Sequence, residues 1–207
     1  MFQFRFPGKR GRTQSDPVAA IFGEIKRQVP WCRRDVLGRL LELSIEIARE
    51  GREGRRIGTV FTLGEADRVL ALSRPLILDP LAGHAPSGTS IFNESACGTI
   101  KELAQLDGAF VVRADGAIQS ASRYLDTTAE GVDLPLGLGT RHLAAASISK
   151  KVGIVAIVVS ESAVVRVFCQ GQLIAELIPE LWLFRHYMQR PHTTSRQGVR
   201  RRSRSSG

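Results

Sequence analysis

The sequence has 207 residues, 43% of them apolar, which is enough material for one well-buried core with appendages. The net charge of +9 suggests a nucleic acid or an acidic membrane as partner, but ten of the 29 basic residues lie in residues 1–12 and 190–207, where no acidic residue occurs. The remaining 19 basic residues are matched by 20 acidic ones, and this near-neutral body argues against nucleic acid as the main ligand.

The first half of the chain predicts two helices and a strand. A weak helical pattern covers residues 18–28, and a clear one ends near Gly51. Residues 57–63 are apolar, β-branched and aromatic, and predict a buried strand. Residues 74–94 are rich in proline, glycine, serine and asparagine, and predict a long loop. The clear helical stripe consists of Val36, Leu40, Leu43 and Ile47.

The elements after this loop alternate between helices and hairpins. A close hairpin pairs its strands antiparallel, whereas a strand covered on both faces is almost continuously apolar. The order predicted is a helix from about Ser95, as N-cap, to Leu106, a hairpin of residues 110–112 and 117–121, a loop over 126–139, a helix over 141–150, an apolar strand over 152–159, a hairpin of 164–169 and 173–177, and a closing helix over 178–189.

These elements predict an α/β fold, a single domain with a central mixed β-sheet flanked by helices. Residues 1–50 are expected to hold a basic N-terminal tail and a helical segment, which could be regulatory or serve oligomerisation. The main domain is expected over residues 51–190. Residues 191–207 are poor in apolar side chains and predict a basic disordered tail.

The tripeptide Asp-Gly-Ala occurs twice, at Asp107 and at Asp115. Asp115 and Gly116 lie between two strand-like segments, and both tolerate the positive φ angles of a tight hairpin. Asp107 lies where the helical pattern closes and the strand opens, so its carboxylate serves no obvious turn. The second copy is therefore interpreted as a turn, and the first needs another explanation.

Cysteine and histidine usage excludes two classes of protein. Cys32, Cys97 and Cys169 are odd in number and widely separated, unlike a disulfide framework or a zinc site, and the four histidines are scattered.

The N-terminus has no apolar stretch of signal-peptide length, and no window approaches the roughly 18 apolar residues of a membrane helix. A cytoplasmic protein is expected.

Three segments carry polar groups at the ends of predicted elements. The segment from Gly137 to His142 suits a phosphate, because glycines admit an anion to the backbone and the following helix adds its N-terminal amides. Asp107 and Glu161 are hard oxygen ligands for Mg²⁺ or Mn²⁺. Each feature alone has a simpler interpretation: Asp-Gly is usually a turn, a glycine-rich loop usually a connector, and Ser160-Glu-Ser usually a loop.

Together and in this order, LDGAFVV, GLGTRHLAAASIS and AIVVSES closely resemble the signatures of the diadenylate cyclase domain, a family that makes cyclic di-AMP from two ATP molecules. The resemblance runs from about Ile57 to Leu177 and includes IQSASRYL and FCQGQLIAEL. It implies that Asp107 belongs to the catalytic copy of Asp-Gly-Ala, and that Asp115 falls in a variable hairpin. One departure is Leu143, where many members have a third basic residue.

The resemblance also implies the role of each residue in the site. The catalytic residues would be Asp107, Arg141 and His142, with Asp107 helping to activate the ribose 3′-hydroxyl. Asp107 and Glu161 would hold the divalent ion. Tyr124 would border the adenine with its ring and Leu125 with its backbone. The full ATP-binding set would be Gly108, Ala109, Tyr124, Leu125, Gly139, Thr140, Arg141, His142 and Ser160.

The implied function is condensation of two ATP molecules, with release of two pyrophosphates, at a site shared by two facing subunits. The partners expected are therefore ATP and a second copy of the chain, with a possible polyanion, nucleic acid or acidic lipid, on the basic tails. Two alternatives remain open at this point. One is a catalytically silent nucleotide sensor, and the other is a basic nucleic-acid-binding protein.

Overall fold

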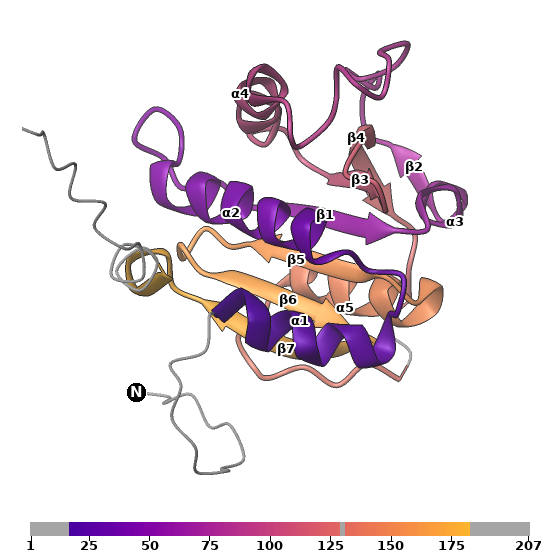
Figure 1. Ribbon diagram of the computed structural model, residues 1–207, viewed down its shortest axis with the longest axis vertical. Helices are drawn as coiled ribbons and strands as arrows, with labels where there is room; N and C mark the ends of the chain where they lie inside the picture. The colour runs from indigo at the N-terminus through magenta and orange to yellow at the C-terminus, as the bar shows by residue number, and fades with distance from the viewer. Residues whose placement is uncertain (1–16, 129–130, 183–207) are drawn as a thin grey trace, which may run out of the picture.

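The computed structural model describes residues 17–128 and 131–182, which form one sheet with helices on both faces (Figure 1). The sheet has seven strands in the order β2-β4-β3-β1-β5-β6-β7. The helices are α1 (Pro17–Gln28), α2 (Arg34–Glu50), α3 (Ala66–Ala71), α4 (Glu94–Leu103) and α5 (Thr140–Val152). The strands are β1 (Thr59–Gly64), β2 (Ser73–Pro75), β3 (Ala109–Arg113), β4 (Ile118–Leu125), β5 (Val155–Val159), β6 (Val165–Cys169) and β7 (Gln172–Leu177).

The sheet is mixed, as predicted. Strands β1 and β3 run parallel, with Phe61 opposite Phe110, and their rings stack with centroids 4.9 Å apart. The other pairings between these strands are antiparallel. A parallel pair needs a long crossover, and the chain from residue 65 to residue 108 supplies it with α3, β2 and α4.

Side chains alternate between the two faces of the sheet, so each strand contributes to two buried clusters. Phe61 and Phe110 lie in the cluster that includes α1, α2 and α4, whereas Val60 and Val111 lie in the one that includes α5. Figure 1 shows α1 and α2 in front of the sheet and α5 behind it. The helical segment before residue 51 thus shares a core with the sheet. Burying a leucine such as Leu40 fully contributes about 1.5–3 kcal/mol.

The hairpin at Asp115 has the geometry that the sequence predicts. Asp115 Oδ1 accepts the N–H of Ala117 at 3.0 Å, Gly116 has φ +92°, and Arg113 lies 3.0 Å from the other carboxylate oxygen. Partial burial by itself raises the pKa of Asp115, but the hydrogen bonds from Ala117 and Arg113 outweigh it and lower that pKa below its ordinary value. This carboxylate is engaged in holding the turn.

The start and end of α4 differ from the prediction. The N-cap is Asn93 rather than Ser95, because the Asn93 side chain accepts the N–H groups of Ser95 and Ala96. The helix ends at Leu103 rather than Leu106. Asparagine and serine are both good caps, so the local sequence did not decide between them.

Three further elements differ from the prediction or extend past the described residues. Val152 ends α5 instead of beginning a strand, because Gly153 adopts a left-handed φ of +77° and stops the helix. The short α3 and β2 were not predicted, since three to six residues show little periodicity. Residues 179–182 are helical, while the rest of the predicted closing helix and both basic tails lie outside the described residues.

Candidate functional site

The strand order brings the predicted site residues to one edge of the sheet. The parallel strands β1 and β3 both begin at this edge, and Val60 pairs with Ala109. Strand β5 is antiparallel to β1, so it ends there, with Val159 opposite Thr59. Asp107 precedes β3 and Glu161 follows β5. Two carboxylates far apart in the sequence therefore meet at the same edge.

Arg141 joins these two carboxylates. Its Nη1 lies 2.7 Å from Glu161 Oε1, and its Nη2 lies 3.2 Å from Asp107 Oδ1. The Asp107 side chain is 85% exposed and that of Glu161 is 63% exposed. Ion pairs this open to solvent contribute little to folding stability. The arrangement instead places two negative groups and one positive group where a ligand can reach them.

Gly58 makes room for this cluster and was not predicted as a site residue. A Cβ atom at this position would lie 2.6 Å from Arg141 Nη1 and 3.1 Å from Glu161 Oε1. Any larger residue would push the guanidinium away from the carboxylates. Only the three-dimensional structure shows this role, because Gly58 simply precedes β1 in the sequence.

Gly108 is required by the sheet itself. It has φ +107°, and a Cβ atom there would lie 2.6–2.8 Å from backbone atoms of Ser122 and Arg123. Strand β4 has a register shift between the partners of Ala109 and Val111, and Ser122 within it has φ +52°. The bulged backbone of β4 thus approaches Gly108 closely. This is a packing reason for glycine, independent of any nucleotide.

The N-terminus of α5 opens at the same edge. The N-cap Gly139 is extended, supplies no side-chain cap, and is followed by exposed Thr140, and the first turn has no acidic residue. The first backbone N–H groups of a helix have no acceptor within the helix and carry the positive end of its dipole. With the Arg141 guanidinium beside it, this end of α5 is suited to an anion.

Ser160 closes the turn that carries Glu161. Its N–H donates to Val164 O at 2.9 Å, and its Oγ lies 2.9 Å from Ser162 Oγ and accepts the Ser162 N–H at 3.2 Å. These bonds fix the short connection between β5 and β6, with the Glu161 side chain exposed to solvent.

His142 makes its side-chain contact with a residue outside the three charged groups. The residue is only 7% exposed, and its Nε2 lies 3.2 Å from Arg166 Nη1 on β6. Phe168 packs edge-on, with ring centroids 6.2 Å apart. Burial lowers the pKa of His142, and the charge of Arg166 lowers it further. Of the three residues predicted to be catalytic, Asp107 and Arg141 are in direct contact, and His142 is buried in the first turn of α5.

The predicted adenine-bordering residues end β4 at the same edge. Tyr124 is half exposed, and the Arg74 guanidinium lies 4.4 Å from its ring centroid. Arg74 also pairs with Asp126 at 3.3 Å. Leu125 is buried and pairs with Ser73 of β2. Arg74 and Asp126 were not predicted, because only the β2–β4 pairing brings them to Tyr124.

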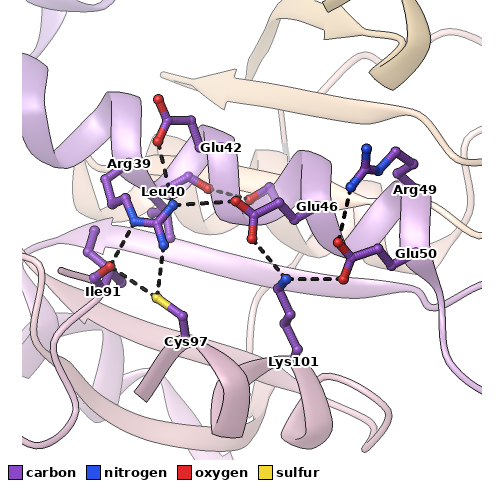
Figure 2. Close-up of polar contacts among 10 residues, drawn as sticks. Arg39, Leu40, Glu42, Glu46, Arg49, Glu50, Ile91, Cys97 and Lys101 are labelled. Carbon is purple, nitrogen blue, oxygen red and sulfur yellow. Dashed lines mark hydrogen bonds and ion pairs between the residues drawn. The ribbon is translucent and has the colours of Figure 1, made fainter. Parts of the chain in front are cut away.

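Helix α4, which leads into Asp107, is fastened to α2 by a second set of charges (Figure 2). Arg39 donates to Ile91 O at 3.0 Å and to Cys97 Sγ at 3.3 Å. Lys101 lies 2.9 Å from Glu46 and 3.0 Å from Glu50. This α2–α4 network (Arg39, Glu42, Glu46, Glu50, Ile91, Cys97, Lys101) anchors the helix that precedes the exposed carboxylate.

The donor set fits a divalent ion that also takes ligands from a nucleotide. Among the described residues there is no group of three or more histidines, cysteines, aspartates or glutamates that could hold a metal by themselves. Mg²⁺, however, is commonly bound by one or two carboxylates together with substrate phosphates and water. Asp107 and Glu161, both in contact with Arg141, supply that number of carboxylates.

Comparison with known proteins gives a consistent result. Residues 46–173 match the family described as DAC: DisA bacterial checkpoint controller nucleotide-binding. The chain is 47% identical over 148 residues to a diadenylate cyclase of Methanocaldococcus jannaschii, covering 71% of this chain and 47% of that protein. It is 42% identical over 158 residues to a diadenylate cyclase of Haloferax volcanii, covering 75% and 56%. The chain thus spans about half the length of these curated relatives.

Two solved structures share the fold. DacA from Staphylococcus aureus, in the form of a double cysteine mutant, has a TM-score of 0.50 at 19% identity, covering 74% of this chain and 93% of that one. A hypothetical membrane-spanning protein from Bacillus cereus has a TM-score of 0.51 at 21% identity, covering 75% and 70%. In the described part of this chain, no helix is long and apolar enough to cross a membrane.

Proposed function

The chain belongs to the DAC family of nucleotide-binding domains, and from that premise we propose that it is a diadenylate cyclase, which condenses two ATP molecules into cyclic di-AMP and releases two pyrophosphates. The observation that carries the proposal is the contact of Arg141 with both Asp107 and Glu161. These residues come from the three motifs of the resemblance, and only the fold brings them together. An exposed cluster of this composition has little value for stability and suits a triphosphate.

Each chemical step joins the 3′-oxygen of one ATP to the α-phosphorus of the other, in line with the leaving pyrophosphate. Positioning and charge neutralisation supply most of the catalysis in such reactions. Asp107 assists loss of the 3′-hydroxyl proton. Arg141 neutralises the triphosphate, joined by Thr140 and the first amides of α5, and by the Ser160 hydroxyl.

Asp107 and Glu161 would hold Mg²⁺ or Mn²⁺, which would supply positive charge to the phosphates when bound. The contact of both carboxylates with the Arg141 guanidinium supports this pairing, because it shows that Asp107 and Glu161 lie within reach of one cationic group. The Tyr124 ring and the Leu125 backbone border the adenine at the end of β4. Gly108, Ala109 and Gly139 bring backbone close to the nucleotide.

Ring closure needs two ATP molecules that face one another, and each domain holds one. The catalytic unit is therefore a face-to-face pair of subunits, in which Asp107 of one chain lies near the α-phosphate held by the other. We place this enzyme in the cytoplasm. The arginines beyond residue 190 are proposed to contact a polyanion, and retention on DNA or anionic vesicles that weakens with salt would support that contact.

Product analysis tests the activity. The purified chain is incubated with ATP and either Mg²⁺ or Mn²⁺, with a chelator in the matched control. The products are then separated and identified by mass spectrometry. Cyclic di-AMP that appears with the ion and not with the chelator is the expected result. Binding of ATP without any cyclic product would indicate a nucleotide sensor instead.

A further inference from the structure

A chain of polar contacts, buried at His142 and open to solvent at Glu176, connects α5 to strands β6 and β7. His142 Nε2 lies 3.2 Å from Arg166 Nη1 on β6, and Arg166 Nε lies 2.5 Å from Glu176 Oε1 on β7. The residue His142 is 7% exposed and the side chain of Arg166 is 14% exposed. None of the three motifs contains Arg166 or Glu176. The relay consists of His142, Arg166 and Glu176.

The chemistry of arginine fixes the protonation state of the ring. A guanidinium keeps its charge at any physiological pH and can only donate hydrogen bonds. His142 Nε2 must then be the acceptor in its contact with Arg166, so it carries no proton. A neutral imidazole has one N–H, which places the proton on Nδ1. The contact therefore selects the Nδ1-protonated tautomer.

The surroundings of the ring favour the same state. Burial lowers the pKa of His142, and the charges of Arg166 and, to a smaller extent, Arg141 lower it further. Glu176 and the nearby Gly139 carbonyl act in the opposite direction without reversing the shift. Nδ1 is buried and makes no hydrogen bond to any residue in the described part of the chain. The ring therefore retains one uncharged donor.

We propose that Arg166, anchored by Glu176, is a positioning residue that holds His142 as the neutral Nδ1–H tautomer and thereby fixes the first turn of α5 for triphosphate binding. The inference rests on the proposed function for its catalytic consequence, and on geometry alone for the state of the ring. The neighbouring residues Arg141 and His142 then have different roles. Arg141 meets the ligand with charge, whereas His142 contributes an uncharged ring that is held from the interior.

An NMR titration tests the state of the ring without any assay of activity. The 15N shifts of the imidazole report the tautomer, the titration reports the pKa, and His142→Gln assigns the signal. The expected result for the wild type is a proton on Nδ1 and a pKa below the ordinary value for histidine. A His142 pKa at the ordinary histidine value, or a proton on Nε2 at neutral pH, would overturn the proposal.

Substitution of Arg166 tests whether this residue sets the protonation state of His142. Arg166→Met should raise the pKa of His142 towards the ordinary histidine value, because it removes both the positive charge and the donor. The KM for ATP should rise roughly 10-fold, by analogy with the loss of a hydrogen-bond partner behind a metal-bound histidine, with a smaller change in kcat. Arg166→Lys should recover part of this loss, because it restores the charge and one donor. An unchanged His142 pKa in Arg166→Met would contradict the proposal.

Two further variants keep the test decisive. Glu176→Gln alters a half-exposed carboxylate, so the fold should persist, and ATP should bind more weakly because Arg166 loses its anchor. Arg113→Met removes an arginine of the hairpin turn and should change neither the His142 pKa nor the KM. If the wild type makes no cyclic di-AMP, titration of the same spectra with ATP replaces the KM. An unchanged ATP affinity in Glu176→Gln would remove the anchoring role.

Discussion

Two charged clusters of similar composition lie on different parts of this molecule, and burial distinguishes them. In the α2–α4 network of Figure 2, the side chains of Arg39 and Lys101 are only 23% and 29% exposed. Arg39 reaches acceptors on α2, on α4 and at Ile91, and Lys101 reaches two carboxylates on α2. In the edge cluster of Asp107, Arg141 and Glu161, the carboxylates are open to solvent. The network connects two helices, whereas the edge cluster leaves its charges available.

The pKa values of charged groups in the α2–α4 network agree with their role in connecting the two helices. Burial by itself raises the pKa of Glu50, but the hydrogen bonds from Lys101 and Arg49 outweigh it and lower that pKa below its ordinary value. The pKa of Lys101 is raised by Glu46 and Glu50 despite the opposing effect of burial. Each partner holds the other in its charged form. These charges are used within the fold, and we expect their loss to affect stability rather than turnover.

The largest effect is expected at the exposed carboxylate that precedes β3. Asp107→Asn should leave the fold intact and abolish cyclic di-AMP formation, because it removes the charge that we propose assists the 3′-hydroxyl. Asp115→Asn is the matched control in the other Asp-Gly-Ala copy, and it should be nearly silent since asparagine also suits a turn. Initial rates and thermal unfolding of both proteins provide the measurement. If the two variants exchanged these behaviours, the choice between the copies would be wrong.

Arg141→Ala should have the next largest effect. It removes the donor that we propose for the triphosphate, and loss of one preorganised donor typically costs about 2–4 kcal/mol of transition-state stabilisation. Stability should change little, because the side chain is partly exposed and its ion pairs face solvent. The ratio kcat/KM for the variant and the wild type measures the loss. Unchanged kinetics would place the triphosphate elsewhere.

Gly58→Ala tests the space beneath Arg141. The added methyl group would meet the flexible end of the guanidinium, so the fold should tolerate it while Arg141 moves off the carboxylates. Such a displacement is expected to lower turnover by about 10-fold. Gly98→Ala in α4 is the control, since a Cβ atom there has nothing within 4 Å. Equal activity of the two variants would show that the position of Arg141 does not matter.

The smallest effect on turnover is expected in the α2–α4 network. Lys101→Met should lower the free energy of unfolding by about 1–2 kcal/mol, because two partly buried carboxylates lose their cation. Turnover per folded molecule should stay close to that of the wild type. Arg49→Met removes an exposed cation with one partner and should cost less than about 0.5 kcal/mol. A large loss of turnover in Lys101→Met would mean that the network reaches the active edge.

Local signals explain what the sequence predicted. The hairpin at Asp115 and Gly116 follows from turn chemistry, and the stripe of Val36, Leu40, Leu43 and Ile47 follows from helical periodicity, so both could be predicted without the fold. Asp107 was singled out because its carboxylate had no local use. Its meeting with Arg141 follows from strand order, which the sequence does not display.

The sequence did not predict residues that matter only through contacts with distant parts of the chain. Gly58 matters because of a guanidinium that comes from α5, and Arg166 and Glu176 matter because of a histidine on that same helix. Arg74 reaches Tyr124 only through the pairing of an edge strand that was too short to predict. The inward direction of His142 also escaped prediction, since a histidine beside an arginine at a helix start looks alike whether it faces a ligand or the core.

The most direct test of the account is the mass of the product made from ATP by the intact chain. At high protein concentration with Mg²⁺ or Mn²⁺, we predict cyclic di-AMP and two pyrophosphates for each pair of ATP molecules consumed. Asp107→Asn, measured alongside, should bind ATP and make none. Saturating ATP binding by the wild type with no cyclic product would contradict the account and leave a nucleotide-binding domain without cyclase chemistry.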